Sequence, residues 1–262
     1  MFNRENRIFG LTKRDSCVSI KERNRKGRVI LQQPVFAQEK NSYRQQEIEQ
    51  YADCYCYEMV PVGEVVYIPN GCVDLLWNGN RRELYCLPDS GQIKTLELTG
   101  EKLFGIHISA FYQCDYKVEK VVEWMEQMEA VSGFEERARQ CSRQFVQRMQ
   151  IKSVHPLVCH AVKQIVEAKG ITAVEGIATE FGYTPRQLER LFYRYFSCGP
   201  KRLCQFVRLC YAVTRMQEAP EQSFAMTAEQ LGYADQSHFH REFKRFTGMT
   251  PKQFALRYCE GR

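Results

Sequence analysis

The chain has 262 residues, 44% of them hydrophobic, and a formal net charge of +6. This length and apolar content suit two domains with ordinary cores. No run of about eighteen apolar residues occurs and the first residues form no apolar signal region, so the sequence predicts no membrane span and a cytoplasmic location. The twelve Cys form no small disulfide framework, and we expect reduced thiols.

The charge is distributed in three blocks. Residues 1–30 carry nine Lys and Arg against three Asp and Glu, residues 31–150 carry twelve against eighteen, and residues 151–262 carry sixteen against ten. The basic C-terminal block suits a domain that contacts phosphates, whereas the acidic middle block argues against nucleic-acid contact there. The first block predicts a mobile basic arm over 1–28, which either adds nonspecific phosphate contacts or is a solvated leader.

Between residues 29 and 115 the pattern is that of short β-strands separated by turn residues. Strands are expected at 29–31, 52–59, 65–68, 72–77, 83–87, 94–98 and 102–108. Pro69-Asn70-Gly71 and Asn78-Gly79-Asn80 have the chemistry of tight turns, the second as a hairpin tip. Strands with no intervening helix predict a small N-terminal β-barrel or sandwich, in a chain of α+β class.

Aromatic and polar residues on these strands are candidates for an effector-binding pocket. The candidates are Tyr55, Tyr57, Tyr67, Asp74, Trp77, Phe104 and His107. Aromatic residues on strands more often form ordinary core, and that alternative stays open.

Four cysteines in the same region suggest a competing role. Cys54 and Cys56 alternate on one strand and so point to one face, and Cys72 and Cys86 are expected near them. Four thiolates could hold zinc, or two could form a redox switch. The spacing matches no C-x-x-C pair, however, and free Cys is commonly a small buried hydrophobe. We therefore predict no metal and no cofactor, and keep thiol or metal sensing as an alternative.

Residues 116–152 change to a helical period and form a predicted helical connector. Ser132 with Glu135 resembles a capping box between two helices. The two apolar stripes are Val118, Val121, Val122, Met125 and Met128, and then Phe134, Ala138, Cys141, Phe145 and Met149. Such stripes either supply a dimer contact or fold back on their own β-domain, and we expect the dimer contact.

His155-Pro156 opens a third helix, which runs to Gly170 and begins an all-α domain over 153–262. This domain contains a repeat. ITAVEGIATEFGYTPRQLERLF is followed later by SFAMTAEQLGYADQSHFHREF, and Ala178 precedes Gly182 by the same interval as Ala228 precedes Gly232. The repeat predicts two units of the same local structure.

Each copy has the signals of a helix-turn-helix. In the first, Thr172 and Glu175 predict a capping box and a helix over 173–181, which Gly182 ends through a positive φ. Thr184 then caps a second helix, which has Pro185 in its first turn. The predicted buried stripes of the second helices are Leu188, Leu191, Phe192 and Tyr195 in the first copy, and Phe239, Phe243 and Phe246 in the second.

The residues left on the open faces of the second helices are of the kinds that read base edges in a DNA major groove. Arg pairs with guanine, Gln pairs with adenine, and Ser or His adapts to several edges. Predicted base-reading residues are Arg186, Gln187, Arg190, Gln236, Ser237, His240 and Arg241. Predicted phosphate contacts are Thr184, Arg194, Lys201, His238, Lys244, Arg245 and Lys252. The alternative to DNA binding is that these polar residues only form two solvent-exposed helix faces.

The segment between the copies is predicted to be one long helix over 201–218, because its apolar residues follow a helical period without internal Gly or Pro. Such a helix spans about 27 Å at ~1.5 Å per residue, while neighbouring major grooves on one DNA face are ~34 Å apart. A rigid connector of that size could place both reading helices in adjacent grooves.

The last hundred or so residues resemble the DNA-binding domain of AraC/XylS-type transcriptional regulators. The resemblance lies in GYTPRQLERLF, in Gly199-Pro200, in RLCYA, and in GYADQSHFHREFKRFTGMTP. Thr227 departs from the pattern by replacing an apolar residue, which would loosen the packing there, and Phe196-Ser197-Cys198 replaces the usual turn. YIPNGCVDLLW also resembles a subgroup with a short β-rich front domain.

The resemblance implies a cytoplasmic, sequence-specific transcription regulator that binds double-stranded DNA as a homodimer. From the two-domain architecture alone we further expect an unknown small-molecule effector in the front domain, and contacts with the transcription machinery. The chain contains no P-loop, HExxH, GxSxG or Rossmann motif, and we predict no enzyme. Some alkyl-transfer DNA repair proteins carry the same kind of domain and are kept as an alternative, although no P-C-H-R motif occurs here.

Overall fold

The computed structural model describes residues 42–48, 51, 53–61, 64–67, 72–87, 94–98, 100–114, 116–196 and 198–258. The basic arm over 1–28, the strand at 29–31 and the turn at 69–71 lie outside these residues. The strands are β1 (Ser42–Glu47), β2 (Tyr55–Val60), β3 (Glu64–Tyr67), β4 (Val73–Asn78), β5 (Glu83–Leu87), β6 (Lys94–Glu97), β7 (Leu103–Ile108), β8 (Tyr112–Cys114) and β9 (Ile151–Ser153). The helices are α1 (Val118–Glu129), α2 (Phe134–Arg148), α3 (Pro156–Glu167), α4 (Val174–Glu180), α5 (Pro185–Tyr195), α6 (Pro200–Glu218), α7 (Phe224–Gln230), α8 (Gln236–Thr247) and α9 (Pro251–Tyr258).

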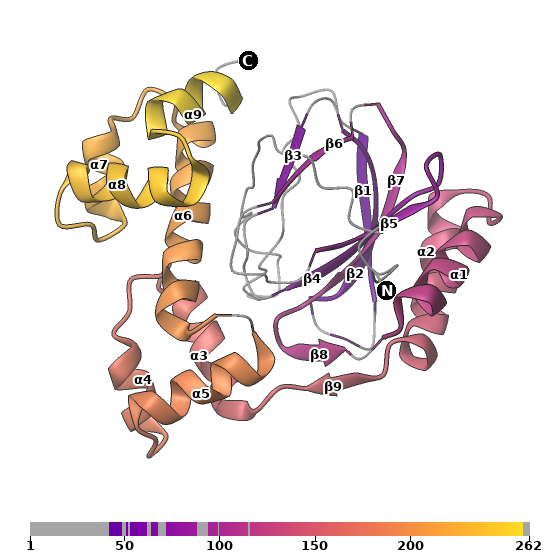
Figure 1. Ribbon diagram of the computed structural model, residues 1–262, viewed down its shortest axis with the longest axis horizontal. Coiled ribbons are helices and arrows are strands. Elements are labelled where there is room, and N and C mark those ends of the chain that lie inside the picture. Colours follow the sequence, from indigo (N-terminus) through magenta and orange to yellow (C-terminus); the bar gives the residue numbers. More distant parts are fainter. Residues whose placement is uncertain are drawn as a thin grey trace, which may run out of the picture.

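The front half is built on an antiparallel sheet of five strands in the order β1-β2-β7-β4-β5, with β3 and β6 paired separately. Six predicted strands are present, and β4 and β5 form the hairpin expected at Asn78-Gly79-Asn80. The described strands form an open sheet rather than a closed barrel (Figure 1). The polar strand β1 was not predicted, because SYRQQE lacks the apolar alternation on which a strand prediction depends.

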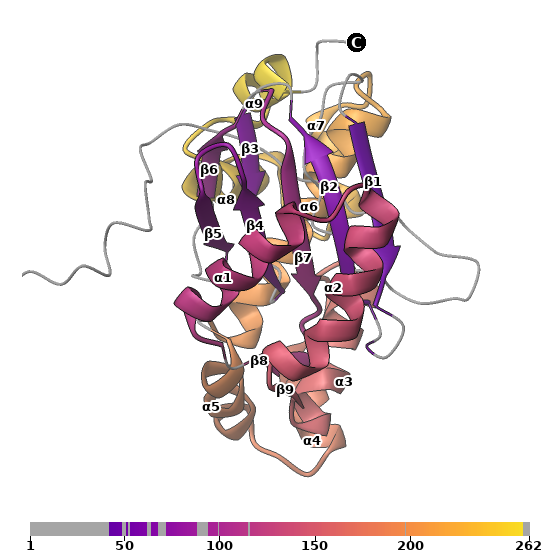
Figure 2. The ribbon, with the colours of Figure 1, turned by 90° about the vertical axis from the view of Figure 1, so that its right-hand side faces the viewer.

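Strand alternation gives this sheet two different buried faces. On one face Leu75, Trp77 and Ile106 share a hydrophobic core with α1 and α2. On the other face Tyr57, Leu76 and their neighbours share a core with Tyr67 and Leu96, which belong to the β3-β6 pair. Both faces are covered, so the central strands β2, β7 and β4 have largely apolar sequences, unlike the edge strand β1. Figure 2 shows α1 and α2 lying across the near face of the sheet.

The apolar stripes of α1 and α2 are buried against the chain's own sheet. Trp124 and Phe145 are among the largest fully buried side chains, and each contributes about 2–3 kcal/mol of hydrophobic stabilisation. The expected dimer contact through these stripes is therefore corrected, because the predicted stripe residues pack into the chain's own core. The Ser132 capping box is also wrong. The N-cap of α2 is Gly133, and no side chain caps that helix.

The C-terminal half is all-helical and is organised around α6. This helix of 19 residues buries apolar side chains on most of its circumference, among them Leu203, Phe206 and Val213. Helices from both repeats and α3 contribute to the same core, as do Cys72 and Ala110 of the front half. Figure 1 shows α6 standing between the two repeats, with the sheet domain beside it. The two halves thus share part of one core.

Within the described residues no helix is long and apolar enough to cross a membrane.

Candidate nucleic-acid interface

The first repeat folds as a helix, a tight turn and a second helix. Ala178 is fully buried in α4, and Gly182 has a φ of 69°, in the left-handed region that glycine tolerates. Thr184 caps α5 as expected: its hydroxyl accepts from the Gln187 N–H at 3.3 Å, and Gln187 Oε1 accepts from the Thr184 N–H at 2.8 Å. The capping box expected at Thr172 and Glu175 is wrong, because α4 begins after Ala173 and has no side-chain cap.

The second helix of this repeat, α5, presents a polar face to solvent. Leu188 and Phe192 are fully buried beneath it, while Leu191 and Tyr195 are half-buried. Arg186, Gln187, Arg190 and Arg194 are all exposed, as predicted from the spacing. No part of the described front half covers them.

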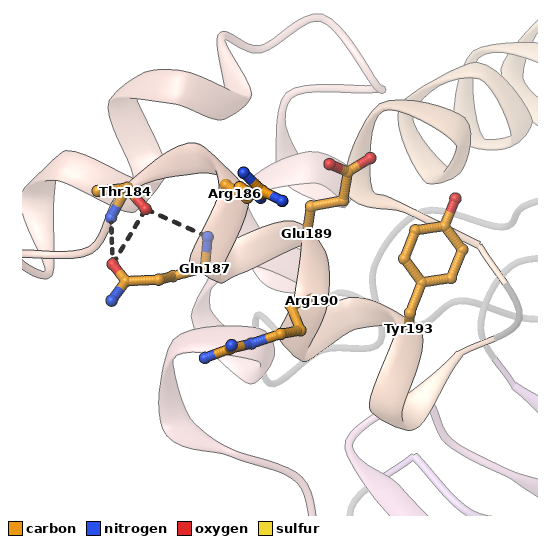
Figure 3. A pocket seen from close by; sticks show the side chains of 6 residues that line it. All are labelled: Thr184, Arg186, Gln187, Glu189, Arg190 and Tyr193. Atoms are coloured by element: carbon orange, nitrogen blue, oxygen red, sulfur yellow. Dashed lines mark hydrogen bonds between the residues drawn. The ribbon is translucent and has the colours of Figure 1, made fainter.

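A shallow hollow runs along this face of α5 (Figure 3). Its lining includes Glu189 and Tyr193, which the sequence analysis did not select. Tyr193 is 59% exposed although it is a large aromatic residue. The spacing from Arg186 to Glu189, Arg190 and Tyr193 is i, i+3, i+4 and i+7, and that helical spacing was a signal available in the sequence. Both residues are therefore added to the candidate interface.

Two predicted contacts of α5 are already engaged inside the chain. The hydroxyl and N–H of Thr184 both contact Gln187 Oε1, at 3.1 and 2.8 Å. A bidentate pair with adenine uses both the oxygen and the nitrogen of a glutamine side chain. As long as the capping box holds, only the Nε2 end of Gln187 can donate to a base.

The second repeat builds the same unit with different capping residues. Ser223 caps α7, and Asp235 caps α8 by accepting from the His238 N–H at 2.6 Å. Gly232 takes the turn position with a φ of 67°. Thr227, where the family pattern has an apolar residue, is buried with its hydroxyl bonded to the Ser223 carbonyl at 3.3 Å. That hydrogen bond satisfies the polar group, so the position is filled rather than loose.

The reading face of α8 is partly exposed and partly packed. Phe239 and Phe243 are buried as predicted, and Phe246 is half-buried. Five of the predicted contacts on α8 are exposed, namely Gln236, Ser237, Arg241, Lys244 and Arg245. The two histidines are only half-exposed, since His240 lies against Phe224 and Phe239 and His238 lies against Tyr233.

A buried carboxylate fixes α8 from below. Glu242 accepts from Tyr233 Oη at 2.9 Å and Gln205 Nε2 at 3.0 Å, and pairs with Arg208 at 3.3 Å. Burial, together with the neighbouring Glu242 charge, raises the pKa of Tyr233, so the phenol stays protonated as the donor. Because Gln205 and Arg208 belong to α6, this cluster ties α8 to the connecting helix.

The predicted phosphate-contacting cations differ in whether they already form ion pairs within the chain. Lys201 pairs with Glu175 at 2.6 Å, and Arg245 pairs with Glu242 at 3.6 Å. The hydrogen bond from Lys201 lowers the pKa of Glu175 and raises that of Lys201. No ion pair among the described residues engages the other cations of the interface, which are Arg186, Arg190, Arg194, Arg241, Lys244 and Lys252.

The connecting helix α6 runs over 200–218, close to the predicted 201–218. Its length is about 28 Å at roughly 1.5 Å per residue. Figure 1 shows the two repeats at its opposite ends. One straight element therefore fixes the distance between the helices that carry the exposed cations.

The effector-binding candidates of the front half do not form one cluster. Trp77 and Phe104 lie on the helix-covered face, whereas Tyr55, Tyr57 and Tyr67 lie on the opposite face. The second group adjoins a buried network, in which Tyr57 Oη donates to Asp74 Oδ1 at 3.1 Å and His107 Nδ1 lies 3.1 Å from the same carboxylate. Tyr55 stacks on the His107 ring at 4.6 Å. A single pocket made of all seven residues is excluded.

His107 is held in its charged form by this network. Burial opposes the charge, but the Asp74 carboxylate outweighs it and raises the pKa of His107 to about 10. The carboxylate and imidazolium therefore satisfy each other inside the sheet domain. This buried pair is an internal structural contact.

The four cysteines considered for sensing are all buried. Cys54, Cys56 and Cys86 are buried on the helix-covered face, and Cys72 belongs to the core shared with α6. Burial raises the pKa of Cys54 to about 12 and also raises that of Cys86, so both stay as unreactive thiols. No group of three or more metal-ligating side chains occurs within the described ranges.

One family model matches the repeated region: the model of a helix-turn-helix domain matches residues 177–257. No curated protein matches the chain.

Several solved structures resemble parts of the chain at low identity. The C-terminal domain of AraT, a response regulator from Geobacillus stearothermophilus, is 22% identical, with 40% of this chain and 88% of that one covered and a TM-score of 0.38. An AraC-type transcriptional regulator from Chromobacterium violaceum is 23% identical over 41% of this chain and 96% of that one, with a TM-score of 0.37. ToxT from Vibrio cholerae O395 is 14% identical over 85% of this chain and 98% of that one, with a TM-score of 0.39. The family match therefore spans both repeats and the connecting helix between them, over residues 177–257.

Proposed function

We propose that this protein is a sequence-specific DNA-binding transcription regulator that reads two adjacent major grooves, one with α5 and one with α8. The observation that carries the proposal is the exposure of cations on both reading helices without ion-pair partners among the described residues. On a helix face without a binding role, such cations usually pair with nearby carboxylates, as Lys201 pairs with Glu175. Cations left open on two similar helices suit a polyanion that carries base edges.

In this proposal the base contacts come from the exposed side chains near the start of each reading helix. Arg186 and Arg190 on α5, and Arg241 on α8, have the free guanidinium groups that guanine recognition uses. Gln236 and Ser237 occupy the first turn of α8, where a recognition helix meets base edges. Tyr193 lies further along α5, where an exposed ring can contact a thymine methyl or a phosphate.

The phosphate contacts hold the protein in register on the duplex. Arg194, Lys244 and Lys252 are exposed and suit this role directly. Lys201 and Arg245 must first exchange a carboxylate for a phosphate. Their contribution to affinity is therefore expected to be smaller.

Control of DNA binding is assigned to the front domain. We propose that a small molecule bound there changes the packing between the sheet domain and α6, since the two share core residues including Cys72 and Ala110. We also propose a homodimer, because a second subunit doubles the sequence read. Its interface must lie outside the buried stripes of α1 and α2. Regulation, rather than catalysis, is the proposed activity, within the cytoplasm and together with the transcription machinery.

Selection of bound fragments from random DNA tests the proposal. The native chain is expected to enrich two short motifs whose centres lie about one helical turn apart, roughly 10 base pairs. Arg190→Ala is expected to relax the choice at a base pair in one motif and Arg241→Ala at a base pair in the other.

The matched control is Arg143→Ala, which removes an exposed arginine from α2 in the front half. It should leave both motifs unchanged. Enrichment of no motif by the native chain, or the same motif from all three variants, contradicts the proposal.

A further inference from the structure

A separate hollow lies on the helix-covered face of the sheet, in the front half of the molecule. Its volume is about 110 Å³, and it is bounded by α1, the β4–β5 turn, the start of β7 and α2. Four buried side chains with no formal charge make its floor: Trp77, Phe104, Met125 and Met128. Trp77 and Phe104 are cross-strand neighbours, so their side chains project from the same face of the sheet. The floor is therefore aromatic and thioether in character.

One donor in this lining has no hydrogen-bond partner. Trp77 is 3% exposed, and its Nε1–H is shielded from water with no acceptor among the described residues. A buried donor left unpaired is unfavourable, and an acceptor that enters from outside restores the bond. Trp124 has the same unpaired Nε1 in the core beneath α1, but it does not line the hollow.

The walls are held by contacts that need no ligand. Arg137 donates to the carbonyls of Met128 and Val131, both at 3.0 Å, and to Glu58 at 3.2 Å. Its guanidinium also lies 5.6 Å from the centre of the Phe104 ring. Arg137 thus joins the end of α1 to the sheet and fixes one side of the hollow. A preformed wall lowers the entropy cost of binding.

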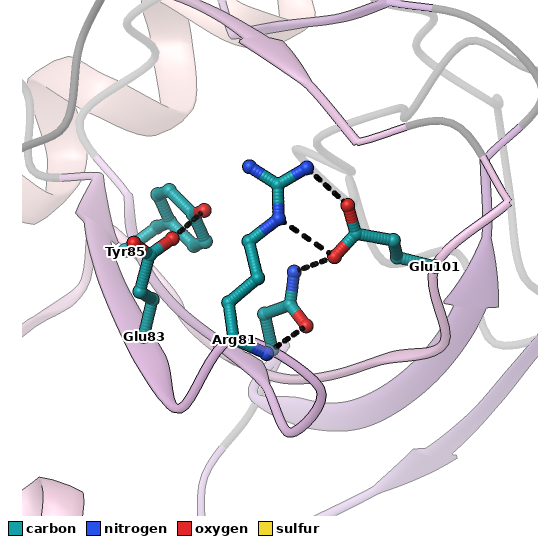
Figure 4. A network of polar contacts seen from close by, with 5 residues as sticks. Arg81, Glu83, Tyr85 and Glu101 are labelled. Carbon is teal, nitrogen blue, oxygen red and sulfur yellow. Dashed lines mark hydrogen bonds and ion pairs between the residues drawn. The ribbon is translucent and has the colours of Figure 1, made fainter.

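The β4–β5 turn on the other side is clamped at two points. Arg81 makes a two-pronged ion pair with Glu101, as Figure 4 shows, and Asn78 donates to the same carboxylate. Arg82 pairs with Glu126 of α1 at 2.6 Å. These contacts hold the turn residues Gly79 and Asn80 in place at the rim.

The mouth carries one charge of each sign. Lys102 is exposed and pairs with Glu58 at 3.0 Å. The exposed Glu129 lies against Gly79, where an added Cβ would come within 1.5 Å of its Oε1. Only a glycine at this position lets the carboxylate rest there. The opposite charges give no preference for a charged ligand.

We propose that this hollow binds a small, neutral, monocyclic aromatic molecule whose single hydrogen-bond acceptor pairs with Trp77 Nε1. The ring lies on the floor, and Met125 and Met128 shift both to admit it and to open its path to Nε1, which water does not reach in this structure. Unbranched thioether chains adapt readily to such a shift. A dry protein cavity of about 150 Å³ holds a benzene ring, so a hollow of this size with an open mouth is of the right order. This site deepens the ligand control proposed above. Binding itself is measured without DNA, so its failure is distinguishable from failure of the DNA-reading role.

The test uses the full-length chain labelled with ¹⁵N at tryptophan, which gives two indole resonances, from Trp77 and Trp124. Pyridine is the probe, and benzene, which has the same shape without an acceptor, is its matched control. Pyridine is expected to move the Trp77 indole signal saturably, with its proton shifting downfield. Benzene is expected to bind roughly threefold to tenfold more weakly, the factor of one net hydrogen bond. The Trp124 signal should stay in place with both.

Two variants complete the test, with binding followed through ¹³C-labelled methionine methyl groups. Trp77→Phe keeps an aromatic floor but removes the donor, and should lower pyridine affinity to that for benzene. Trp124→Phe removes the other unpaired donor and should leave pyridine affinity unchanged. Equal affinity of the native chain for pyridine and benzene, or no saturable shift of Trp77, overturns the proposal. The comparison of pyridine with benzene on the native chain decides the proposal even if neither variant folds.

Discussion

The two helix-turn-helix units have the same outline but are fixed to the connecting helix by different chemistry. Where α5 has the half-buried Leu191, the aligned position of α8 has the buried Glu242. The first unit is therefore held to α6 by apolar packing, through residues such as Phe192, and by the exposed Lys201–Glu175 ion pair. The second adds a carboxylate bonded to Tyr233, Gln205 and Arg208.

This difference shows how one copy of a duplicated unit can be held in a more sharply defined orientation than the other. Apolar contacts tolerate small rotations, whereas a buried carboxylate with three partners accepts only a narrow range of orientations. The orientation of α8 relative to α6 is thus more sharply defined than that of α5. The cost is vulnerability, because the loss of one partner leaves the others buried and unpaired.

The largest expected effect comes from removing that carboxylate. Glu242→Leu makes the second unit resemble the first but leaves the Arg208 charge without its partner, and should cost roughly 3 kcal/mol of stability. Thermal unfolding followed by circular dichroism measures it. Adding Arg208→Met should recover most of the loss, while Glu189→Leu on the exposed face of α5 should change stability by less than about 0.5 kcal/mol. If Glu242→Leu alone is as stable as the native chain, the Glu242 cluster does not anchor the second unit more firmly than the first.

The next effect concerns DNA affinity. Arg190→Ala and Arg241→Ala occupy aligned, exposed positions, and each should cost about 1–3 kcal/mol against the selected sequence. Titration of labelled duplexes measures the loss. Because α8 is the more firmly oriented helix, we expect the Arg241 variant to lose more discrimination between matched and mismatched duplexes. Equal losses on matched and scrambled duplexes would show that these arginines contact only phosphates.

Substitution of the two turn glycines should have a smaller effect, measured on stability. Gly182→Ala forces a side chain into positive φ where no atom lies near the new Cβ, and should cost about 1 kcal/mol. Gly232→Ala has the same backbone strain and also brings the Cβ to 2.9 Å from Ile171 Cγ2. We expect a loss of about 2 kcal/mol, because Ile171 must shift as well. Similar melting temperatures for the two variants would show that Ile171 moves away freely.

The smallest effect is expected in salt dependence. Lys252→Ala should lower the slope of log affinity against log salt by about one unit. Lys201→Ala should lower it by less, because Lys201 gives up its Glu175 partner on binding. Conversely, Glu175→Gln should raise affinity slightly at low salt. If Lys201→Ala and Lys252→Ala lower the slope equally, the Glu175 pair has no influence on binding.

Local chemistry made the reading units predictable from sequence. The turn glycines and the Thr184 cap act within a few residues of themselves, so their roles can be inferred without tertiary contacts. The prediction of a cap at Thr172 failed because α4 begins one residue later, after Ala173, whose side chain cannot accept a hydrogen bond.

Long-range partners could not be inferred in the same way. An amphipathic stripe on α1 predicts a covered face but not whether a sheet or a second subunit covers it. Glu242 gives no sign of burial, since its main partner Arg208 lies 34 residues away. The candidate pocket residues were similarly divided between two sheet faces, because strand register is set by pairing partners that the local pattern does not reveal.

The core contacts of Cys72 and Ala110 with the α6 cluster bear on how the protein can be dissected. Removing the first 150 residues would expose the apolar surface of the helical half that Cys72 and Ala110 cover. Such a fragment should aggregate in solution unless polar residues replace the apolar ones that become exposed.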